Sequence, residues 1–374
     1  MTAQFLYGTL CHPPLLEVVL GRVPLLEPAM APGWSSYWVA GAAYPTIEHG
    51  AGACEGVLIM DLCDEDILRM DFYEGGFGYQ TKEIAAVTKA GRKLEAHVYM
   101  SDAGALPIGD AWVLADWEQR WGQTVVAAAQ EFMAQFGASS AEALRRRYPQ
   151  MLVRGGSRVR AEALRAGTET LRRSCQPGDT VTRDLRHPYA AYFSVEEYAL
   201  RYRRFDGEMS AELERAAFIS GDASIVLPYD PIRDRVMVIE QFRVGPYARG
   251  DANPWLIEAI AGRVDGGESP QEAARREAVE EAGLVLQELI AGPNYYPSPG
   301  AKAEYLYSFV GITDLPDGAA GMGGLEDEAE DIRSHVIPFA QLMALIASGE
   351  VNNAPLIILA YWLDGQRQAL RAGP

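Results

Sequence analysis

The chain has 374 residues, too many for one ordinary hydrophobic core, and at roughly 100 to 200 residues per domain it should form two domains. Hydrophobic residues make up 48% and charged residues 22%, which is typical of globular proteins and argues against a disordered or membrane protein. The formal net charge of -18 repels polyanions, so nucleic acid is not expected as a partner. A small anion held through metal ions remains compatible with this charge.

The ends and the cysteines of the chain suggest a reducing compartment. The first residues, 1–7, lack a basic region, and no run reaches about 18 apolar residues, so we expect a cytoplasmic protein without a membrane segment. The four cysteines are scattered without the spacing of a zinc site, which predicts reduced thiols. They are Cys11, Cys54, Cys63 and Cys175.

The first hundred residues are rich in β-formers, interrupted by glycine and proline. One helix should begin at Asp64-Glu65-Asp66, because acidic residues are favourable at a helix N-terminus and an apolar face follows. Strands are predicted at 4–10, 36–43, 53–62 and 95–100.

The composition turns helical over 109–167 and becomes β-rich again after the turn-forming segment 174–179. Strands are predicted at 192–202, 223–227 and 236–242, and a glycine-rich loop at 318–324. We therefore predict a first domain at 1–135, a helical connector at 136–180 and a second domain at 181–374.

The strongest motif begins at Gly262, continues after five residues with Glu268 and, after seven more, with the run Arg-Glu-Ala-Val-Glu-Glu-Ala-Gly-Leu at 276–284. This spacing resembles the signature of the Nudix hydrolases. One departure is Ala278, where that family prefers a bulkier aliphatic residue, and we attribute the change to local packing.

The residues of the motif predict a helix over 271–282. Ser269 is a favourable N-cap, Pro270 suits the first helical position and Gly283 suits the C-terminal end. Arg276 should tie the Glu268 carboxylate to the helix and keep the helix in register.

Three glutamates of this helix, Glu277, Glu280 and Glu281, lie three or four residues apart and share one face. Their mutual repulsion is offset if divalent cations bind between them, and Mg²⁺ is the usual ion beside phosphates, with Mn²⁺ as an alternative. The competing interpretation is a solvated acidic face. The spacing of the flanking glycines favours the metal platform.

Beyond the motif, the region from His187 to the end resembles the bacterial ADP-ribose diphosphatases. The resemblance is carried by the segments at 205–210, 227–231, 240–243, 254–258, 298–300 and 325–332, together with Glu304. It implies a Nudix α/β/α sandwich, a homodimer that exchanges amino-terminal strands, and Mg²⁺-dependent hydrolysis of ADP-ribose to AMP and ribose 5-phosphate. The alternatives are another nucleoside diphosphate sugar or a dinucleotide, or a sensor that binds ADP-ribose without cleaving it.

The resemblance also assigns roles at the metal site and in catalysis. The implied ligands are Glu277, Glu281, Glu330 and the backbone carbonyl of Ala261. Glu328 matches the general base and Glu280 is its rival, while a solvated loop is the competing interpretation for the acidic run 326–331.

Further positions match groups that contact substrate. Those for the diphosphate and ribose are Arg215, Arg243, Arg263, Ser298, Pro299, Gly300 and Glu304. Tyr192 and Phe193 match an aromatic pair that packs on adenine, the alternative being core packing of a strand. Two departures bear on affinity and substrate choice. Ser220 replaces a substrate-contacting arginine, and Ala216 replaces an acidic residue.

The amino-terminal region resembles the γ-glutamylcyclotransferase-like (AIG2-like) family through Tyr7-Gly8-Thr9-Leu10, supported by 56–58, 68–74 and Tyr79. The resemblance implies a mixed β-barrel with helices, a loop that binds the substrate carboxylate through backbone amides, and Glu74 as the acid/base that closes a lactam. The alternatives are a surface carboxylate at a helix end and a domain that serves as a scaffold or oligomerisation module.

Overall fold

The computed structural model describes residues 3–164, 170–325 and 330–372, and the chain forms two compact units, Met1–Ala166 and Gly167–Pro374. Both units combine helices with strands, so the predicted mixed α/β class of the two domains is confirmed. The predicted connector at 136–180 is divided, because its helices pack within the first unit and its last residues belong to the second.

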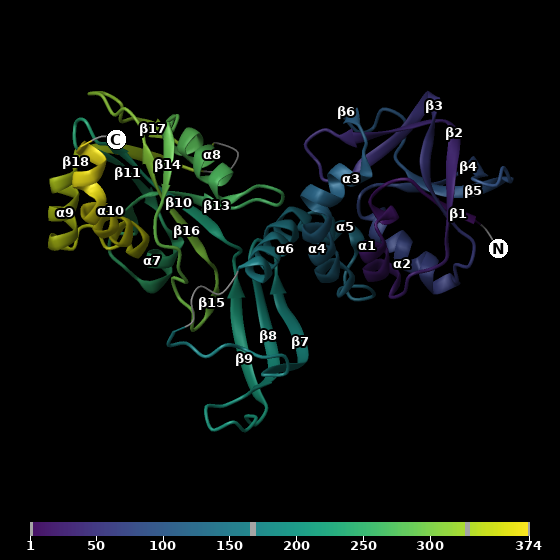
Figure 1. The fold of residues 1–374 in the computed structure, drawn as a ribbon, viewed down its shortest axis with the longest axis horizontal. Coiled ribbons are helices and arrows are strands. Elements are labelled where there is room, and N and C mark those ends of the chain that lie inside the picture. The colour runs from purple at the N-terminus through teal and green to yellow at the C-terminus, as the bar shows by residue number, and fades with distance from the viewer. Residues whose placement is uncertain (1–2, 165–169, 326–329, 373–374) are drawn as a thin grey trace. The chain divides into compact units, whose positions relative to one another are not determined.

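Within the described residues, five strands of the first unit close into a barrel in the order β3-β1-β5-β4-β2, with β2 pairing back to β3 (Figure 1). Strand β1 is parallel to β5 and the other barrel pairs are antiparallel, which makes the barrel mixed. The strands are β1 (Ala3–Leu6), β2 (Leu26–Val39), β3 (Pro45–Ile59), β4 (Gln80–Thr88) and β5 (Lys93–Met100), and β6 (Ile108–Ala111) extends the sheet beside β2.

Alternation along the strands separates two cores. Phe5 and Val98 pack inside the barrel, whereas their neighbours Leu6 and Tyr99 pack on the helices outside it. The helix predicted at Asp64 is confirmed as α2. The helical segments are the 3-10 turn Thr9–Cys11, α1 (Pro13–Leu20), α2 (Asp64–Gly75), α3 (Leu114–Trp117), the π-helical turn Glu118–Gly122, α4 (Gln123–Met133), α5 (Ala141–Arg145) and α6 (Tyr148–Ala163).

Helices α4 and α6 pack closely because Gly155 has no side chain. A Cβ atom at Gly155 would lie 2.7 Å from the carbonyl oxygen of Thr124. One residue away, the buried Arg154 donates two hydrogen bonds to the buried Glu131 carboxylate, with Nε at 3.0 Å and Nη2 at 2.5 Å. This contact fixes α6 against α4 and makes both part of the first unit.

The second unit contains a small sheet and a large one. The small sheet has the order β15-β9-β8-β7, formed by β7 (Thr180–Ala190), β8 (Ser194–Tyr202), β9 (Leu213–Ile219) and β15 (Lys302–Ala303). The large sheet has the order β14-β16-β10-β11-β18-β17, with β12 paired to β11 and β13 paired to β10. Its strands are β10 (Ala223–Asp230), β11 (Arg235–Phe242), β12 (Trp255–Glu258), β13 (Ile260–Arg263), β14 (Glu288–Ala291), β16 (Leu306–Ile312), β17 (Met322–Gly323) and β18 (Ile332–Pro338).

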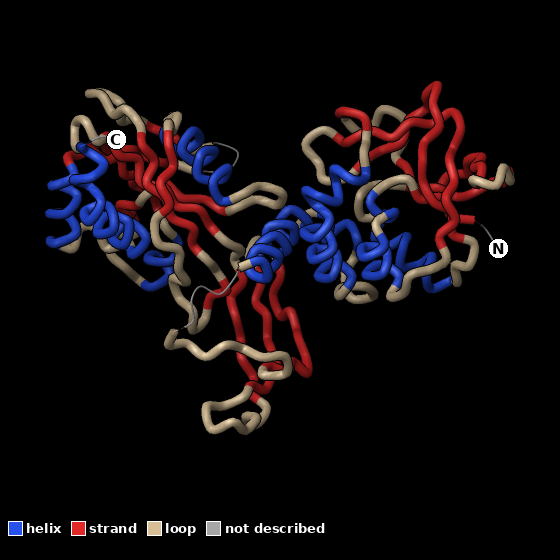
Figure 2. The backbone as a smooth tube through the Cα atoms, viewed as in Figure 1, coloured by secondary structure: helices blue, strands red, loops and turns tan. Residues whose placement is uncertain are grey.

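Helices cover both faces of the large sheet (Figure 2). Val226 and Met237 pack toward α8 (Pro270–Ala282), whereas their neighbours Leu227 and Val238 pack toward α9 (Phe339–Ser348) and α10 (Ala354–Ala372). A short helix, α7 (Val244–Arg249), follows β11. The predicted α/β/α sandwich is therefore confirmed. None of the described helices is both long and apolar enough to cross a membrane.

Candidate functional site

Helix α8 begins and ends where its sequence predicts. The Ser269 hydroxyl accepts a hydrogen bond from the Glu272 backbone N–H at 3.2 Å, and the Glu272 carboxylate accepts one from the Ser269 N–H at 2.7 Å. Gly283 ends the helix in the left-handed conformation with φ 63°. These caps place the glutamates of the helix in a defined register.

Arg276 organises the carboxylates around α8. Its guanidinium donates to Glu268 at 2.8 Å, which confirms the predicted tie between the loop and the helix. The same guanidinium donates to Glu277 at 2.7 Å and to Glu280 at 2.8 Å. One cation therefore partly neutralises three carboxylates and restricts where they point.

Glu277 and Glu281 form an acidic pair in which Glu281 is buried and Glu277 is half-buried. Only 2% of Glu281 is exposed, and its carboxylate accepts a hydrogen bond from the Ala261 backbone N–H at 3.2 Å. Burial, reinforced by the charges of Glu277 and Glu330, raises the pKa of Glu281 to about 9. Burial also raises the pKa of Glu277 to about 7 against the opposing effect of Arg276. For both carboxylates burial outweighs the arginine that opposes it, Arg276 for Glu277 and Arg243 for Glu281, and a bound cation would add positive charge.

Two glycines allow the loops to approach this helix. A Cβ atom at Gly262 would overlap the Glu277 carboxylate, which explains why the motif begins with glycine. A Cβ atom at Gly323 would overlap the backbone of Glu281, so the predicted glycine-rich loop packs on the end of α8. The following acidic loop brings Glu330 close enough to raise the pKa of both glutamates. Glu328 lies outside the described residues.

The donor chemistry of this site fits a hard divalent cation, since carboxylate oxygens converge beside a backbone strand. In the described part of the chain, no three acidic, histidine or cysteine side chains form a finished metal cage. The hydrogen bonds explain this: Arg276 holds the Glu277 carboxylate, and the Ala261 N–H holds that of Glu281.

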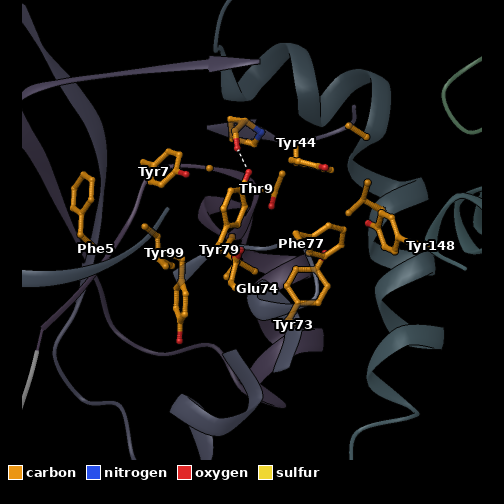
Figure 3. A pocket seen from close by; sticks show the side chains of 16 residues that line it. Phe5, Tyr7, Thr9, Tyr44, Tyr73, Glu74, Phe77, Tyr79, Tyr99 and Tyr148 are labelled. Carbon is orange, nitrogen blue, oxygen red and sulfur yellow. Dashed lines mark hydrogen bonds between the residues drawn. The ribbon is translucent and has the colours of Figure 1, made fainter. Parts of the chain in front are cut away.

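The first unit contains a pocket of about 540 Å³, counting its part open to solvent (Figure 3). All four residues of the predicted loop, Tyr7 to Leu10, line it together with Glu74. Pro45 closes one side, and its carbonyl oxygen accepts a hydrogen bond from the Tyr79 hydroxyl at 2.5 Å. The structure thus brings the predicted loop and the predicted acid/base into one cavity.

Glu74 belongs to the last turn of α2 and is half-buried in the wall of this pocket. Burial raises the pKa of its carboxyl group to about 8, far above the ordinary value of 4.5. An ordinary surface carboxylate would not show this shift. A glutamate that changes protonation near neutral pH inside a cavity is suited to general acid/base chemistry.

Comparison with known proteins decides the family. Residues 4–119 match the family Gamma-glutamyl cyclotransferase, AIG2-like, and residues 221–359 match the NUDIX domain. The chain is 41% identical over 183 residues to ADP-ribose pyrophosphatase of Escherichia coli (strain K12), covering 49% of this chain and 87% of that protein. The chain belongs to the Nudix pyrophosphohydrolases.

Two further relatives match a similar share of this Nudix pyrophosphohydrolase. ADP-ribose pyrophosphatase of Haemophilus influenzae is 35% identical over 178 residues, with 47% of this chain and 82% of that protein covered. GDP-mannose pyrophosphatase of Enterobacter sp. (strain 638) is 33% identical over 174 residues, with 46% and 88% covered. Relatives named for two different substrates, ADP-ribose and GDP-mannose, therefore each match nearly half of the chain.

The structure places the predicted adenine pair in the turn between β7 and β8 of the Nudix unit. The Arg263 guanidinium lies 4.2 Å from the centre of the Tyr192 ring, and 55% of Tyr192 is exposed. Phe193 packs on Phe218 at 4.7 Å between ring centres. Tyr192 is thus a surface residue beside an arginine and does not belong to a strand core.

Ser220, which stands where the similar enzymes have an arginine, forms hydrogen bonds with two predicted substrate residues. Its buried hydroxyl donates to the Glu304 carboxylate at 3.1 Å, while its carbonyl oxygen accepts a hydrogen bond from Arg263 at 3.4 Å. Lys302 contacts the same Glu304 oxygen at 2.8 Å. Ser220 therefore connects two predicted substrate residues, Arg263 and Glu304.

Arg243 is held by two residues that sequence reasoning did not single out. Its Nε donates to Glu258 at 2.7 Å, and the Asn353 amide donates to the other oxygen of Glu258 at 2.7 Å. Glu258 lay within a segment used for the resemblance, but Asn353 carried no sequence signal. The positive charge of Arg243 opposes the rise in the pKa of Glu281, so Arg243 lies near enough to Glu281 to interact with its charge.

The remaining predicted substrate residues lie on the surface of the Nudix unit. Arg215 on β9 is exposed and donates to the carbonyl oxygen of Glu214 at 2.8 Å. Ser298, Pro299 and Gly300 form an exposed turn before β15. The Ser298 carbonyl accepts hydrogen bonds from the backbone N–H groups of Ala301 and Lys302. Among the described residues, no hydrogen bond or ion pair joins them to Glu277 or Glu281.

Proposed function

We propose that the Nudix unit hydrolyses the diphosphate of a nucleoside diphosphate sugar, and that ADP-ribose is its substrate, giving AMP and ribose 5-phosphate. The observation that carries the proposal is the pair Glu277 and Glu281, with Arg243 near enough to oppose the rise in the pKa of Glu281 and Arg263 on strand β13, two residues from Ala261, whose N–H binds Glu281. Carboxylates for a cation and guanidinium groups for phosphates then occupy one site. The names of the similar proteins agree with this class of substrate.

The residues that would hold Mg²⁺, or Mn²⁺ in its place, are Glu277, Glu281, Glu330 and the carbonyl of Ala261. When bound, the ion would neutralise charge that develops on the phosphate oxygens. Arg276 keeps the glutamates of α8 in register, and it occupies the Glu280 carboxylate. Because that hydrogen bond competes with proton acceptance, we favour Glu328 over Glu280 as the base that activates water.

Recognition of adenine and ribose is proposed for the side of the site that contains Tyr192. An exposed ring backed by Arg263 can stack on a purine while the guanidinium faces phosphate oxygens. Glu304, held by Ser220 and Lys302, is placed to accept hydrogen bonds from sugar hydroxyl groups. This arrangement supports a nucleotide that contains ribose as the ligand.

A nucleotide panel with and without Mg²⁺ tests the proposal. We expect ADP-ribose to yield AMP, detected by chromatography, and the reaction to stop when the metal is chelated. Faster hydrolysis of GDP-mannose or of a dinucleotide would move the substrate to that alternative. Calorimetric binding of ADP-ribose without turnover would favour the sensor.

A homodimer through the small sheet is proposed as well. Several large apolar side chains of β7 and β8 are more than two-fifths exposed, which is unusual for an isolated sheet. They are Val181, Leu185, Tyr189 and Tyr202. Light scattering after gel filtration should give twice the mass of the chain, and the mass of one chain would contradict the dimer.

We also propose that the AIG2-like unit cyclises a γ-glutamyl amide. The observation that favours this second activity is Glu74 in the same pocket as the Tyr7–Leu10 loop. Ionised Glu74 would take a proton from the substrate α-ammonium, and the freed amine would attack the γ-carbonyl carbon. The amide C–N bond then breaks, the proton passes to the departing amine, and 5-oxoproline forms. Mass spectrometry of 5-oxoproline with the wild type and Glu74→Gln tests this activity.

A further inference from the structure

The pocket of the first unit extends beyond the part that matches the AIG2-like family. That match ends at residue 119, yet Val125 from α4 and Tyr148 from α6 line the cavity. Figure 3 shows Tyr148 on the far side of Glu74 from Tyr7. Helices that follow the family domain in sequence therefore build the wall opposite the loop that contains Tyr7.

Tyr148 is held rigidly in this wall. Only 7% of it is exposed, and its ring packs edge-on against Phe77 with 4.8 Å between ring centres. Its hydroxyl lies close to that of Tyr73, which is also buried in the wall of the pocket. Behind it, the Arg154–Glu131 pair anchors α6 to α4. A side chain fixed on three sides cannot move aside for a larger or differently charged ligand.

The lining of the pocket is aromatic and almost without charge. Of the sixteen described residues that line it, eight are Phe or Tyr, none is Lys, Arg or His, and Glu74 is the single acid. The backbone amides of the Gly8–Leu10 loop and the Glu74 carboxyl can serve the zwitterionic head of a γ-glutamyl group. Beyond Glu74, a ligand meets aromatic rings and tyrosine hydroxyls but no second charged side chain, so a second ammonium group would lose its hydration without gaining a carboxylate partner.

We propose that the wall formed by α4 and α6 restricts this pocket to γ-glutamyl amides whose amine portion is uncharged and apolar or aromatic, with Tyr148 as the specificity-determining residue. The inference rests on the proposed cyclotransferase activity and names its substrate class. It excludes amides of diamines, whose far end carries a second ammonium group, because Glu74 already serves the α-ammonium group and the lining offers no other acid.

The test compares two amides of nearly equal size on the full-length protein. In γ-glutamyl-hexylamide the chain ends in a methyl group, and in γ-glutamyl-(5-aminopentyl)amide it ends in an ammonium group. We expect kcat/KM for release of 5-oxoproline to favour the hexylamide by at least about tenfold. γ-Glutamyl-benzylamide should be cyclised at least as well as the hexylamide.

Variants at Tyr148 assign the preference to the wall. Tyr148→Phe should keep the selectivity ratio, whereas Tyr148→Ala should lower it at least about fivefold, chiefly through KM for the apolar amides. Tyr361→Ala, an exposed tyrosine of α10, is the matched control and should change neither value. If Tyr148→Ala fails to fold, calorimetric binding of both amides to Glu74→Gln gives the same comparison without turnover.

The outcomes separate this inference from the activity on which it rests. Cyclisation of both amides with equal efficiency, or a selectivity ratio that Tyr148→Ala leaves unchanged, would overturn the inference while the cyclotransferase activity stands. Neither cyclisation nor binding of any γ-glutamyl amide would overturn both.

Discussion

The Nε atom of Arg243 lies 2.7 Å from a carboxylate oxygen of Glu258, and the two residues form an ion pair. Only 6% of Glu258 is exposed. The other oxygen of Glu258 accepts a hydrogen bond from Asn353, whose own side-chain oxygen caps the start of α10 by accepting from the Leu356 N–H at 3.2 Å. Through this chain the helix on one face of the sheet fixes the direction of Arg243. The guanidinium keeps its remaining N–H groups for a phosphate.

Loss of this anchor should weaken catalysis without removing metal binding. We expect Glu258→Gln to lower kcat/KM for ADP-ribose about tenfold, since a hydrogen bond to a charged group contributes on the order of 1.5 to 3 kcal/mol. The apparent affinity for Mg²⁺ should stay near the wild-type value. Steady-state kinetics over a Mg²⁺ titration checks both, and a parallel loss of metal affinity would show a general collapse of the site instead.

The acidic pair itself should be indispensable. We expect Glu281→Gln to reduce hydrolysis of ADP-ribose at least about 100-fold at saturating Mg²⁺, because a buried carboxylate opposite Glu277 is replaced by a neutral amide that holds a divalent cation poorly. Glu288→Gln, on the exposed strand β14, is the matched control and should keep full activity. Normal turnover by the first variant would contradict the proposed metal ligands.

Ser220 offers a finer test of substrate recognition. Ser220→Ala removes the hydrogen bond to Glu304, which contributes about 0.5 to 1.5 kcal/mol, so KM for ADP-ribose should rise about fivefold with little change in kcat. The same substitution at the exposed Ser348 should have no effect. A change in kcat alone would place Ser220 outside the ribose subsite.

Local sequence signals predicted the parts of the site that depend on neighbouring residues. The caps Ser269 and Gly283 define α8, and the Arg276–Glu268 contact spans only eight residues. The Glu258–Asn353 contact spans 95 residues and joins a strand to a helix, so no spacing rule could reveal it. For the same reason, the helical composition after residue 109 predicted helices but not that Tyr148 would line the pocket of Glu74.

The protonation of Glu74 should make the first unit sensitive to pH. Its pKa is about 8 in the folded chain and close to 4.5 when unfolded, so folding takes up a proton between these values. The stabilising contribution is complete below about pH 4.5 and is lost as the pH rises through about 8. The melting temperature of wild type relative to Glu74→Gln should therefore fall from pH 5 to pH 9, and a constant difference would contradict the shifted pKa.

The same group should set the pH dependence of cyclisation. As a base, Glu74 must be ionised, so kcat/KM for a γ-glutamyl amide should rise with pH and level off above about 8. Glu74→Asp, which retains an ionisable carboxyl group, should keep a rise with pH at a lower rate, while Glu74→Gln should show no cyclisation. A rate that is flat from pH 6 to pH 9 would exclude Glu74 as the base.

The buried pair of Arg154 and Glu131 should control the stability of the first unit more than any exposed ion pair. Arg154→Ala leaves the Glu131 carboxylate buried without its partner, and such a loss costs about 3 to 5 kcal/mol. The double substitution Arg154→Met with Glu131→Leu removes both charges and should recover most of that stability. Denaturant unfolding followed by tryptophan fluorescence measures the difference, with Arg146→Ala as the control because its pair with Glu142 is exposed. Since α6 carries Tyr148, Arg154→Ala should also weaken binding of apolar amides in the pocket. Unfolding and binding that match the wild type would show that α6 is held by its apolar contacts alone.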